Sequence, residues 1–345
     1  MTLLSRRSFL SGLATVSATA LIPGSKSRAA ETTYEDLKHD EILGQGDFKY
    51  RVNRYWGRLD RSQHPVNDCH GIIEDKQGRI LMLTNNTQNN IIAYSKQGDY
   101  LTSWEHRFPA AHALRIENYK GSERYWITDC GISTIALCEP DGTEIRRISP
   151  VAVSSKYPDI SKYHPTNVAF MPDGDFYVSD GYGSNFVHHF DPDWKLISTF
   201  GGSGKSPSHL KTPHSVWLDM RSKKPSLLIC DRGNAKLKWF SLNGELEKVV
   251  ALPGAEPSNI SPFGDSLAIT SLNGMILILD KSNTVVSAVG GEAPVYKEGI
   301  LQPLVPYNYT LTHPHDVYID SRKDLYIAQW NSYKTYPIKL EHIVA

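Results

Sequence analysis

The chain has 345 residues, of which 37 are Lys or Arg and 37 are Asp or Glu, so its formal net charge at neutral pH is zero. This balance gives no basic footprint for nucleic acid and no attraction to an anionic membrane surface. The length suffices to bury a large core, and beyond residue 30 no run of 18 apolar residues exists that would span a bilayer.

The first thirty residues have the organisation of an export signal. Ser5-Arg6-Arg7-Ser8-Phe9-Leu10 carries an arginine pair, an apolar stretch follows through Ile22, and Ala29-Ala30 supplies small residues suited to cleavage. We predict a twin-arginine signal peptide over residues 1–30, which engages the bacterial twin-arginine export machinery and delivers the chain to the periplasm or the exterior. The alternative is a chance arginine pair ahead of an apolar helix.

The chain contains four cysteines, which are Cys69, Cys130, Cys138 and Cys230. Four in a chain of this length make no disulfide framework, and none belongs to a Cys-x-x-Cys pair. The periplasm permits disulfides, but the spacing selects no pairing. We expect each cysteine to be a small buried apolar side chain.

A unit of strands and turns recurs through residues 31–345. Its clearest copy has strand-like segments at 166–170, 176–182, 185–190 and 195–200, rich in aromatic and β-branched residues with near period-two alternation. Polar turns such as Asp173-Gly174 separate these segments. Six copies align by their first strands, and these strands start at His70, His112, Thr166, His214, Ser258 and His315.

The copies recur every 42 to 57 residues, which leaves room for four antiparallel strands in each. One such sheet cannot bury both its faces alone, so we predict an all-β, six-bladed β-propeller in a single domain. The sixth copy ends one strand short, after residues 336–341, whereas residues 49–56 are strand-like and precede the first copy. We expect this segment to supply the outer strand of the sixth blade and close the ring.

Histidines occupy four of the six equivalent positions at the start of the inner strands. Because the inner strand of each blade lines the central channel, one register position forms a ring around the axis. His112, His214 and His315 are 102 and 101 residues apart, two blades each time. Three imidazoles on alternate blades approximate a trigonal set with an open fourth position, as in catalytic zinc sites.

The alternative for each histidine is a hydrogen-bonded place in the core, since buried polar groups are normally satisfied there. The alternate-blade spacing favours metal binding for three of them. His70 is a fourth ligand, a partner of a ligand or a proton acceptor. We assign no metal to the histidines expected at the channel mouth or in the packing, which are His164, His313, His188 and His189.

The ends of the second strands lie one step further along the channel. Tyr182 and Arg232 break the repeat there with reactive side chains, whereas Asp180 and Asp231 recur at one register and are expected to bond neighbouring backbone. A tyrosine beside a divalent cation can act as a base, and an arginine can clamp a carboxylate in bidentate fashion. The alternative is ordinary decoration of the propeller without a catalytic role.

The repeats resemble those of NHL-repeat propellers. From residue 112 to 338 the chain is similar to peptidyl-α-hydroxyglycine α-amidating lyase, the lyase module of the peptide-amidating enzymes. The matching segments are Ala111-His112-Ala113-Leu114, Pro165-Thr166-Asn167-Val168, Ser179-Asp180-Gly181-Tyr182, Pro213-His214-Ser215-Val216, Asp231-Arg232 with Asn234, and Pro314-His315-Asp316-Val317. Single motifs of this kind occur in other propellers, but all of them in order at blade spacing are specific.

The resemblance implies that His112, His214 and His315 bind a catalytic zinc. It also implies that Tyr182 is the base and that Arg232 lies in the substrate site. In this family, an N–C bond of a carbinolamide breaks and releases an amide and glyoxylate.

The resemblance further implies a structural calcium, held by the backbone carbonyls of Ile72 and Leu114 and by the carboxylate of Asp316. Two positions depart from the family. Asn85 stands near the place of a second substrate-binding arginine, and His70 takes a ring position where the family has a small residue. We therefore expect the substrate to have changed.

From these features we predict an exported lyase that depends on zinc or another divalent transition metal, and that acts on a small molecule, a peptide or a glycan. Tyr182 or His70 takes a proton, and Arg232 holds an anionic group. Two alternatives stay open. One is a non-catalytic NHL-type propeller that binds a peptide or glycan, and the other is a polysaccharide or glycoside lyase on the same scaffold.

Overall fold

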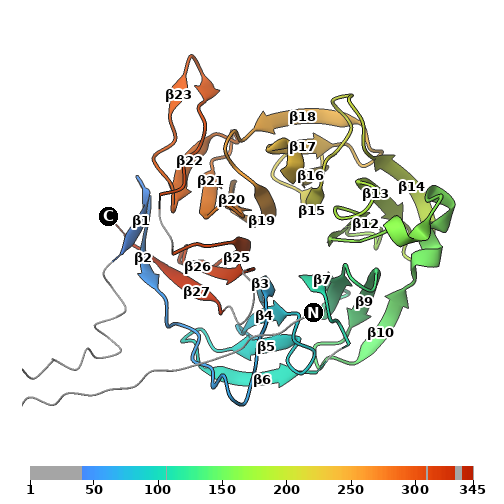
Figure 1. The fold of residues 1–345 in the computed structure, drawn as a ribbon, viewed down its shortest axis with the longest axis horizontal. Helices are drawn as coiled ribbons and strands as arrows, with labels where there is room; N and C mark the ends of the chain where they lie inside the picture. The colour runs from blue at the N-terminus through green and yellow to red at the C-terminus, as the bar shows by residue number, and fades with distance from the viewer. Residues whose placement is uncertain (1–40, 106, 308–309, 331–335, 345) are drawn as a thin grey trace, which may run out of the picture.

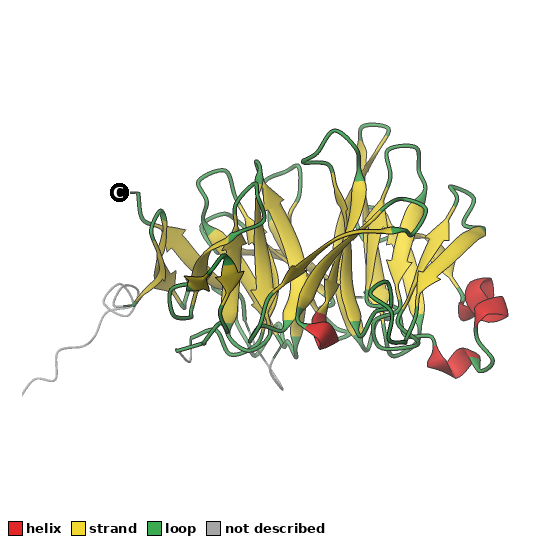
Figure 2. Ribbon diagram, turned by 90° about the horizontal axis from the view of Figure 1, so that it is seen from above, coloured by secondary structure: helices red, strands yellow, loops and turns green. Residues whose placement is uncertain are grey.

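In the computed structural model, the described residues are 41–344 without 106, 308–309 and 331–335. They form six antiparallel sheets arranged as blades around a central axis (Figure 1), which confirms the predicted six-bladed propeller. Seen from the side, the strands run between the two faces of a disc (Figure 2). The predicted signal peptide, residues 1–30, lies outside the described residues.

Five blades have four strands each. From the axis outward, the first blade has β3 (Cys69–Glu74), β4 (Ile80–Thr84), β5 (Ile91–Tyr94) and β6 (Tyr100–Trp104), and the second has β7 (Ala111–Tyr119), β8 (Ser122–Asp129), β9 (Thr134–Cys138) and β10 (Glu144–Ile148). The third has β11 (Asn167–Phe170), β12 (Phe176–Ser179), β13 (Phe186–Phe190) and β14 (Leu196–Gly201), and the fourth has β15 (Pro213–Asp219), β16 (Ser226–Asp231), β17 (Lys236–Phe240) and β18 (Leu246–Ala251). The fifth has β19 (Pro257–Phe263), β20 (Ser266–Ser271), β21 (Met275–Leu279) and β22 (Val285–Val289).

The sixth blade has five strands and joins the two ends of the described chain. From the axis outward they are β25 (Pro314–Ile319), β26 (Leu325–Gln329), β27 (Ile338–His342), β2 (Phe48–Asn53) and β1 (Ile42–Gln45). Outside the blades lie the hairpin strands β23 (Tyr296–Lys297) and β24 (Ile300–Leu301) and the 3-10 helices η2 (Pro150–Lys156), η3 (Ile160–Lys162) and η4 (Arg232–Asn234). Among the described residues, no helix has the length and apolarity needed to cross a membrane.

Burial along the strands follows their distance from the axis. The second strand β4, with sequence Ile-Leu-Met-Leu-Thr, is buried at every position, whereas the outer strand β10 is exposed at four of its five positions. Six apolar clusters fill the spaces between neighbouring blades, one cluster at each interface. Each blade therefore depends on both neighbours to cover its apolar faces, and the ring has to close.

Closure is made by the N-terminal part of the described chain, as the sequence predicts. Strand β2 pairs antiparallel with β27, with Val52 opposite Leu340. Strand β1, which was not expected from the sequence, then adds a fifth strand at the outer edge. Its Leu43 is 1% exposed and packs in the cluster between the fifth and sixth blades.

A single glutamine fastens this edge to the neighbouring blade. The side-chain amide of Gln45 accepts a hydrogen bond from Ala288 N at 2.8 Å and donates one to Gly291 O at 2.8 Å. Its backbone N–H donates to Ser287 Oγ at 3.1 Å. The amide thus takes the place of a short strand against β22, which leaves fewer backbone groups open for edge-to-edge pairing.

The cysteines mostly behave as expected. Cys69, Cys138 and Cys230 are buried, whereas Cys130 is partly exposed beside the channel mouth. In the described part of the chain no disulfide joins them.

Two neighbouring residues of β1 test the closure. Leu43→Ala should lower the free energy of unfolding by about 2–5 kcal/mol, because it removes a buried side chain between two blades. Ile42→Ala should change it by less than about 0.5 kcal/mol, because Ile42 is 54% exposed. Urea unfolding of both variants measures the difference, and equal effects would mean that β1 does not contribute to closure.

Candidate metal centre

A β-bulge places the ring residue of most blades at the channel axis. In β3, Cys69 pairs with Thr84 and Gly71 with Leu83, so the residue between them is unpaired. A bulged residue is re-aimed relative to the regular alternation of a strand, and bulges are frequent beside functional sites. The residues at this bulge, one from each of five blades, are His70, His112, His214, Ser258 and His315.

The four histidines converge in the channel, and each is between 1% and 7% exposed. His112 Nε2 lies 3.2 Å from His315 Nε2, which in turn lies 3.4 Å from His70 Nδ1. The ring centroid of His214 lies 4.7 Å from that of His112 and 4.8 Å from that of His315. The register of the repeat therefore located the histidine cluster correctly.

Three of these histidines are held in the same way by the next blade. Each uses Nδ1 to bond the backbone carbonyl of the following ring residue, at 2.7 or 2.8 Å. A carbonyl oxygen only accepts, so Nδ1 carries the proton in each case. The three pairs are His112 with Thr166, His214 with Ser258, and His315 with His70.

This arrangement fixes the tautomer and leaves Nε2 as a lone-pair donor. Burial, with smaller contributions from neighbouring charges, lowers the pKa of His112, His214 and His315 well below the usual value, so the rings are neutral near pH 7. A second hydrogen bond from the far ring nitrogen to a carbonyl is the usual support of metal-binding histidines. The donor set therefore suits a divalent transition ion.

The contact between His112 and His315 also favours a bound metal ion. With both Nδ1 atoms protonated, their Nε2 lone pairs face each other across 3.2 Å, and neither can donate to the other. Two ligand atoms about 2.0–2.1 Å from a tetrahedral zinc stand roughly 3.4 Å apart. A cation between them would turn this repulsion into two favourable bonds.

The grouping differs in one respect from the predicted trio. The ligand atoms that lie within 4.8 Å of one another belong to His70, His112 and His315, and this group can hold a metal ion. His214 Nε2 instead lies 3.0 Å from the Tyr182 hydroxyl. The sequence left His70 open as a fourth ligand, a partner of a ligand or a proton acceptor, because its ring orientation cannot be read from the register of the repeat.

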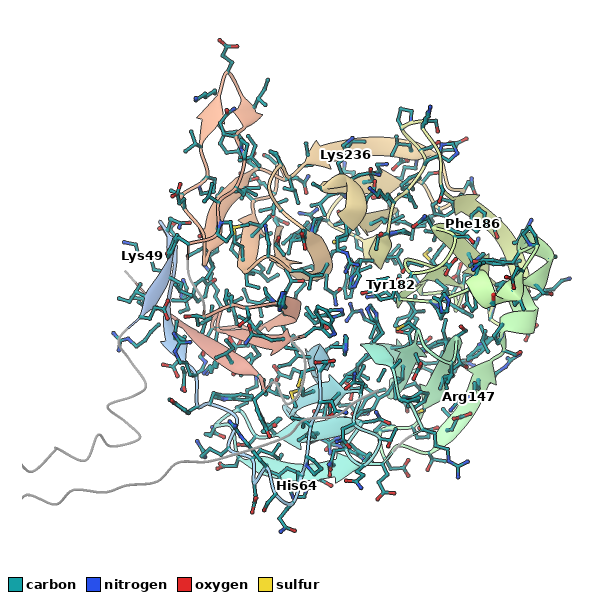
Figure 3. The ribbon with its side chains drawn as sticks, in the orientation of Figure 1. Lys49, His64, Arg147, Tyr182, Phe186 and Lys236 are labelled. Atoms are coloured by element: carbon teal, nitrogen blue, oxygen red, sulfur yellow. The ribbon has the colours of Figure 1, made fainter. Side chains whose placement is uncertain are left out.

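Tyr182 lies near the central channel (Figure 3), and its hydroxyl is within hydrogen-bonding distance of two of the histidines. The hydroxyl is 3.0 Å from His214 Nε2 and 3.2 Å from His112 Nε2, and it has one proton for these two acceptors. Arg232 Nη1 donates to the same oxygen at 3.4 Å. Burial raises the pKa of Tyr182 above its usual value, and the charge of Arg232 acts in the opposite direction.

Most of the remaining residues singled out in the sequence have hydrogen-bond partners; the exception is His313, whose Nδ1 is buried without one among the described residues and whose ring packs 5.5 Å from that of Trp330. His164 bonds a backbone carbonyl at 2.8 Å at the channel mouth, and His188 bonds a buried tyrosine hydroxyl at 2.8 Å. Asp180 and Asp231 each accept from the backbone N–H of a preceding loop, at 2.7 Å, as expected. Asn85 Oδ1 accepts from a backbone N–H at 3.0 Å, so its amide is committed to a turn.

An arginine side chain lies where calcium was expected. Arg115 Nη1 donates to Leu114 O at 2.9 Å and to Asp316 Oδ2 at 3.2 Å, and Nη2 bonds the side-chain oxygen of Asn259. The backbone N–H of Ile72 also donates to Asp316 Oδ2, at 3.2 Å. A guanidinium therefore contacts two of the three predicted calcium ligands and supplies the positive charge between them. No motif in the sequence singled out Arg115.

This buried pair gives a stability test. Arg115→Met should lower the free energy of unfolding by about 3–5 kcal/mol, because it leaves the Asp316 carboxylate buried without its partner. The double variant with Asp316→Asn should recover part of this loss, and calcium in excess should not raise the melting temperature of the unmodified protein. Stabilisation by calcium, or a double variant no better than the single one, would contradict this description.

Comparisons with known proteins support the resemblance seen in the sequence. No protein-family model matches the chain. It is 24% identical over 310 residues to peptidyl-glycine alpha-amidating monooxygenase B of Xenopus laevis, covering 85% of this chain and 33% of that protein. It is 30% identical over 230 residues to the mouse peptidyl-glycine alpha-amidating monooxygenase, covering 64% and 21%. A probable peptidyl-alpha-hydroxyglycine alpha-amidating lyase of Caenorhabditis elegans is 26% identical over 200 residues, covering 56% and 51%.

Solved structures show the same fold at lower identity. A streptogramin B lyase superposes with a TM-score of 0.56 at 13% identity, covering 87% of this chain and 98% of its own. A gluconolactonase from Xanthomonas campestris gives 0.59 at 12% identity, covering 88% and 96%. The chain spans between about a fifth and about half of the length of the three sequence relatives above. It is thus a six-bladed β-propeller that resembles the peptidyl-α-hydroxyglycine α-amidating lyases at low identity.

Proposed function

We propose that this chain is an exported, metal-dependent lyase of the hydroxyglycine-amidating type, acting on a substrate that has diverged from that of its relatives. One observation carries the proposal. Three buried imidazoles have Nδ1 committed to backbone carbonyls, so their Nε2 lone pairs are presented together beneath Tyr182 and Arg232. The similarity to proteins named as amidating lyases supports the reaction class.

The proposed ligands are His112, His214 and His315, because these three share the same fixed tautomer. His70 has the short distance to His315 but no carbonyl partner for its ring among the residues that the structure describes, and burial lowers its pKa to about 3. In this proposal His70 stays a neutral proton acceptor beside the ligands. Imidazole nitrogen favours zinc or another divalent transition ion over calcium or magnesium.

The ion, when bound, supplies Lewis-acid polarisation of a substrate oxygen. Tyr182 lies within hydrogen-bonding distance of two proposed ligands and accepts from Arg232, so it is positioned to exchange a proton with a substrate hydroxyl. Arg232 is partly exposed and keeps guanidinium N–H groups for an anionic substrate group.

The proposed reaction is a redox-neutral elimination. The proton of the substrate hydroxyl passes to the phenolate form of Tyr182, which the charge of Arg232 and a bound cation would favour, or to neutral His70, as the C–O bond becomes a carbonyl. The C–N bond breaks with its electron pair going to nitrogen, and the nitrogen is then protonated to give the amide. Two features support a changed substrate. The side-chain amide of Asn85 is committed to a backbone hydrogen bond, and His70 takes a position in the ring. Neither residue can replace the anion contact that a second arginine would make.

Metal content tests the ligand assignment. The unmodified protein, purified without chelator, should contain one equivalent of a divalent transition metal by elemental analysis. His214→Ala should lose it, whereas His70→Ala should keep it. If His70→Ala lost the metal and His214→Ala kept it, the ligands would instead be His70, His112 and His315. Absence of metal from all three proteins would favour the non-catalytic propeller.

Activity tests the role of Tyr182. With a peptide that ends in α-hydroxyglycine, Tyr182→Phe should release glyoxylate about 10²–10⁴ times more slowly at unchanged metal content. Tyr307→Phe is the matched control, because Tyr307 is 50% exposed in another part of the molecule. An unaffected rate in Tyr182→Phe would exclude it as the base. No glyoxylate from metal-loaded protein would turn the search to polysaccharide or glycoside substrates, assayed by their unsaturated products.

The processing and location of the chain in a bacterial host test the proposed export route. Replacing both Arg6 and Arg7 with lysine should leave the chain unprocessed and inside the cytoplasm, because the twin-arginine route reads the arginine pair itself. Exchanging Lys26 for Arg and Arg28 for Lys changes the basic residues nearer the cleavage site and should have no effect. Normal processing of the first variant would contradict twin-arginine export.

A further inference from the structure

The turn that carries Tyr182 has little backbone support of its own. It spans residues 181–184, directly after β12 and Asp180 in the third blade. The backbone N–H of Tyr182 donates to His164 O at 3.4 Å, which is long for such a bond. The place of the Tyr182 hydroxyl beside the histidines therefore depends on the other groups that hold this turn.

The carboxylate of Asp180 clamps the turn. Its Oδ2 accepts from the backbone N–H of Ser184, across the turn, at 2.6 Å, and its Oδ1 accepts from that of His164 at 2.7 Å. A Cβ on Gly183 would lie 2.0 Å from Asp180 Oδ1 and 2.1 Å from Lys162 O, so only glycine fits this close approach. Asp180 is fully buried, and the turn is thereby fastened to the interior of the blade.

A third donor reaches this carboxylate from the segment that joins the second and third blades. Tyr157 follows η2 in that segment, and its hydroxyl lies 2.7 Å from Asp180 Oδ2. The same hydroxyl lies 2.8 Å from His188 Nε2, and His188 Nδ1 lies 2.9 Å from Thr199 Oγ1. A carboxylate only accepts, so the Tyr157 proton lies toward Asp180. His188 then donates to Tyr157 through Nε2 and accepts from Thr199 through Nδ1, which gives one directed chain of hydrogen bonds.

The groups that hold the carboxylate are uncharged. Burial raises the pKa of Asp180, and its hydrogen bonds, led by the one from Tyr157, act in the opposite direction. Burial also lowers the pKa of His188 to about 3, so this ring is neutral near pH 7. The hydroxyl of Tyr157 is therefore one of three neutral donors that offset the cost of burying the carboxylate.

The fourth blade solves the same problem with a lysine. Asp231 stands at the register of Asp180, and Lys238 stands at the register of His188, because Lys238 pairs with Ile229 as His188 pairs with Val178. Lys238 Nζ reaches Asp231 Oδ2 directly, at 2.8 Å.

The imidazole of His188 is shorter than a lysine side chain, and the Tyr157 hydroxyl bridges the remaining distance to Asp180. The aspartate of the third blade thus depends on a residue from the connecting segment, whereas that of the fourth blade depends on its own sheet.

We propose that Tyr157 is a positioning residue: through Asp180 it holds the turn that places Tyr182 beside the proposed metal ligands. Its effect on the rate rests on the proposed lyase function, whereas its effect on the Tyr182 side chain rests on the turn alone. Without the Tyr157 hydroxyl, Asp180 Oδ2 keeps one donor of two, and His188 Nε2 loses its acceptor. The turn can then shift, and a misplacement of about 1 Å can cost about 10²-fold in rate.

Tyr157→Phe tests this role, because it removes the hydroxyl and keeps the ring. Tyr163→Phe is the matched control. Tyr163 lies in the same segment with its ring centroid 5.7 Å from that of Tyr157, and its hydroxyl is buried without a hydrogen-bond partner among the described residues. Removing that second hydroxyl should change neither the rate nor the Tyr182 side chain.

The kinetic test uses a peptide that ends in α-hydroxyglycine. Tyr157→Phe should lower kcat about tenfold, with KM and metal content little changed, because it misplaces a group that acts in the transition state. In a protein that already carries Tyr182→Phe, the same change should lower kcat no further, because the hydroxyl to be positioned is gone. Equal lowering of kcat in both backgrounds would mean that Tyr157 only stabilises the fold.

A spectroscopic test needs no activity. In protein labelled with ¹³C-tyrosine, the ring signal of Tyr182 is the one that disappears in Tyr182→Phe. This signal should shift or broaden in Tyr157→Phe and stay in place in Tyr163→Phe. A Tyr182 signal unmoved in Tyr157→Phe, or moved equally in the control, would overturn the proposal. Absence of glyoxylate from the unmodified protein would instead contradict the lyase function, and the ring signal would still decide whether Tyr157 positions Tyr182.

Discussion

The hydrogen bond from a histidine Nδ1 to the carbonyl of the next blade's ring residue is the interaction on which the site depends. It occurs three times, on alternate blades, at 2.7 to 2.8 Å. Each bond joins two blades, so it forms only if neighbouring blades stand at the right angle and height. The chemistry of Nε2 is thereby tied to the geometry of the whole ring rather than to any single strand.

Other features of the fold support these three bonds. The β-bulges turn the ring residues toward the axis, and the six apolar clusters set the spacing between blades. The outer strands β2 and β1 close the ring, so the sixth and first blades meet as the others do. The bond from His315 to His70 O crosses that closing junction. A defect in the closure of the ring would therefore disturb the geometry of the candidate metal site directly.

The repeat allowed the fold and the place of the cluster to be predicted, because a register repeated six times determines which residues line the channel. Side-chain direction beyond that register was not accessible. The bulge at the ring position and the carbonyl partners depend on inter-blade geometry, and the inclusion of His70 in the compact group depends on its ring orientation. Arg115 was missed because it lies three residues past the ring and acts only by crossing the channel to Asp316. Strand β1 was missed because four residues carry too little pattern to distinguish a strand from a loop.

The most direct test of this account is the tautomer of the channel histidines in metal-free protein, read from long-range ¹⁵N–¹H NMR correlations. The account predicts that His112, His214 and His315 are neutral near pH 7 and carry their proton on Nδ1. Any of the three found as an imidazolium, or protonated on Nε2, would contradict it, because Nε2 would then have no lone pair for a metal.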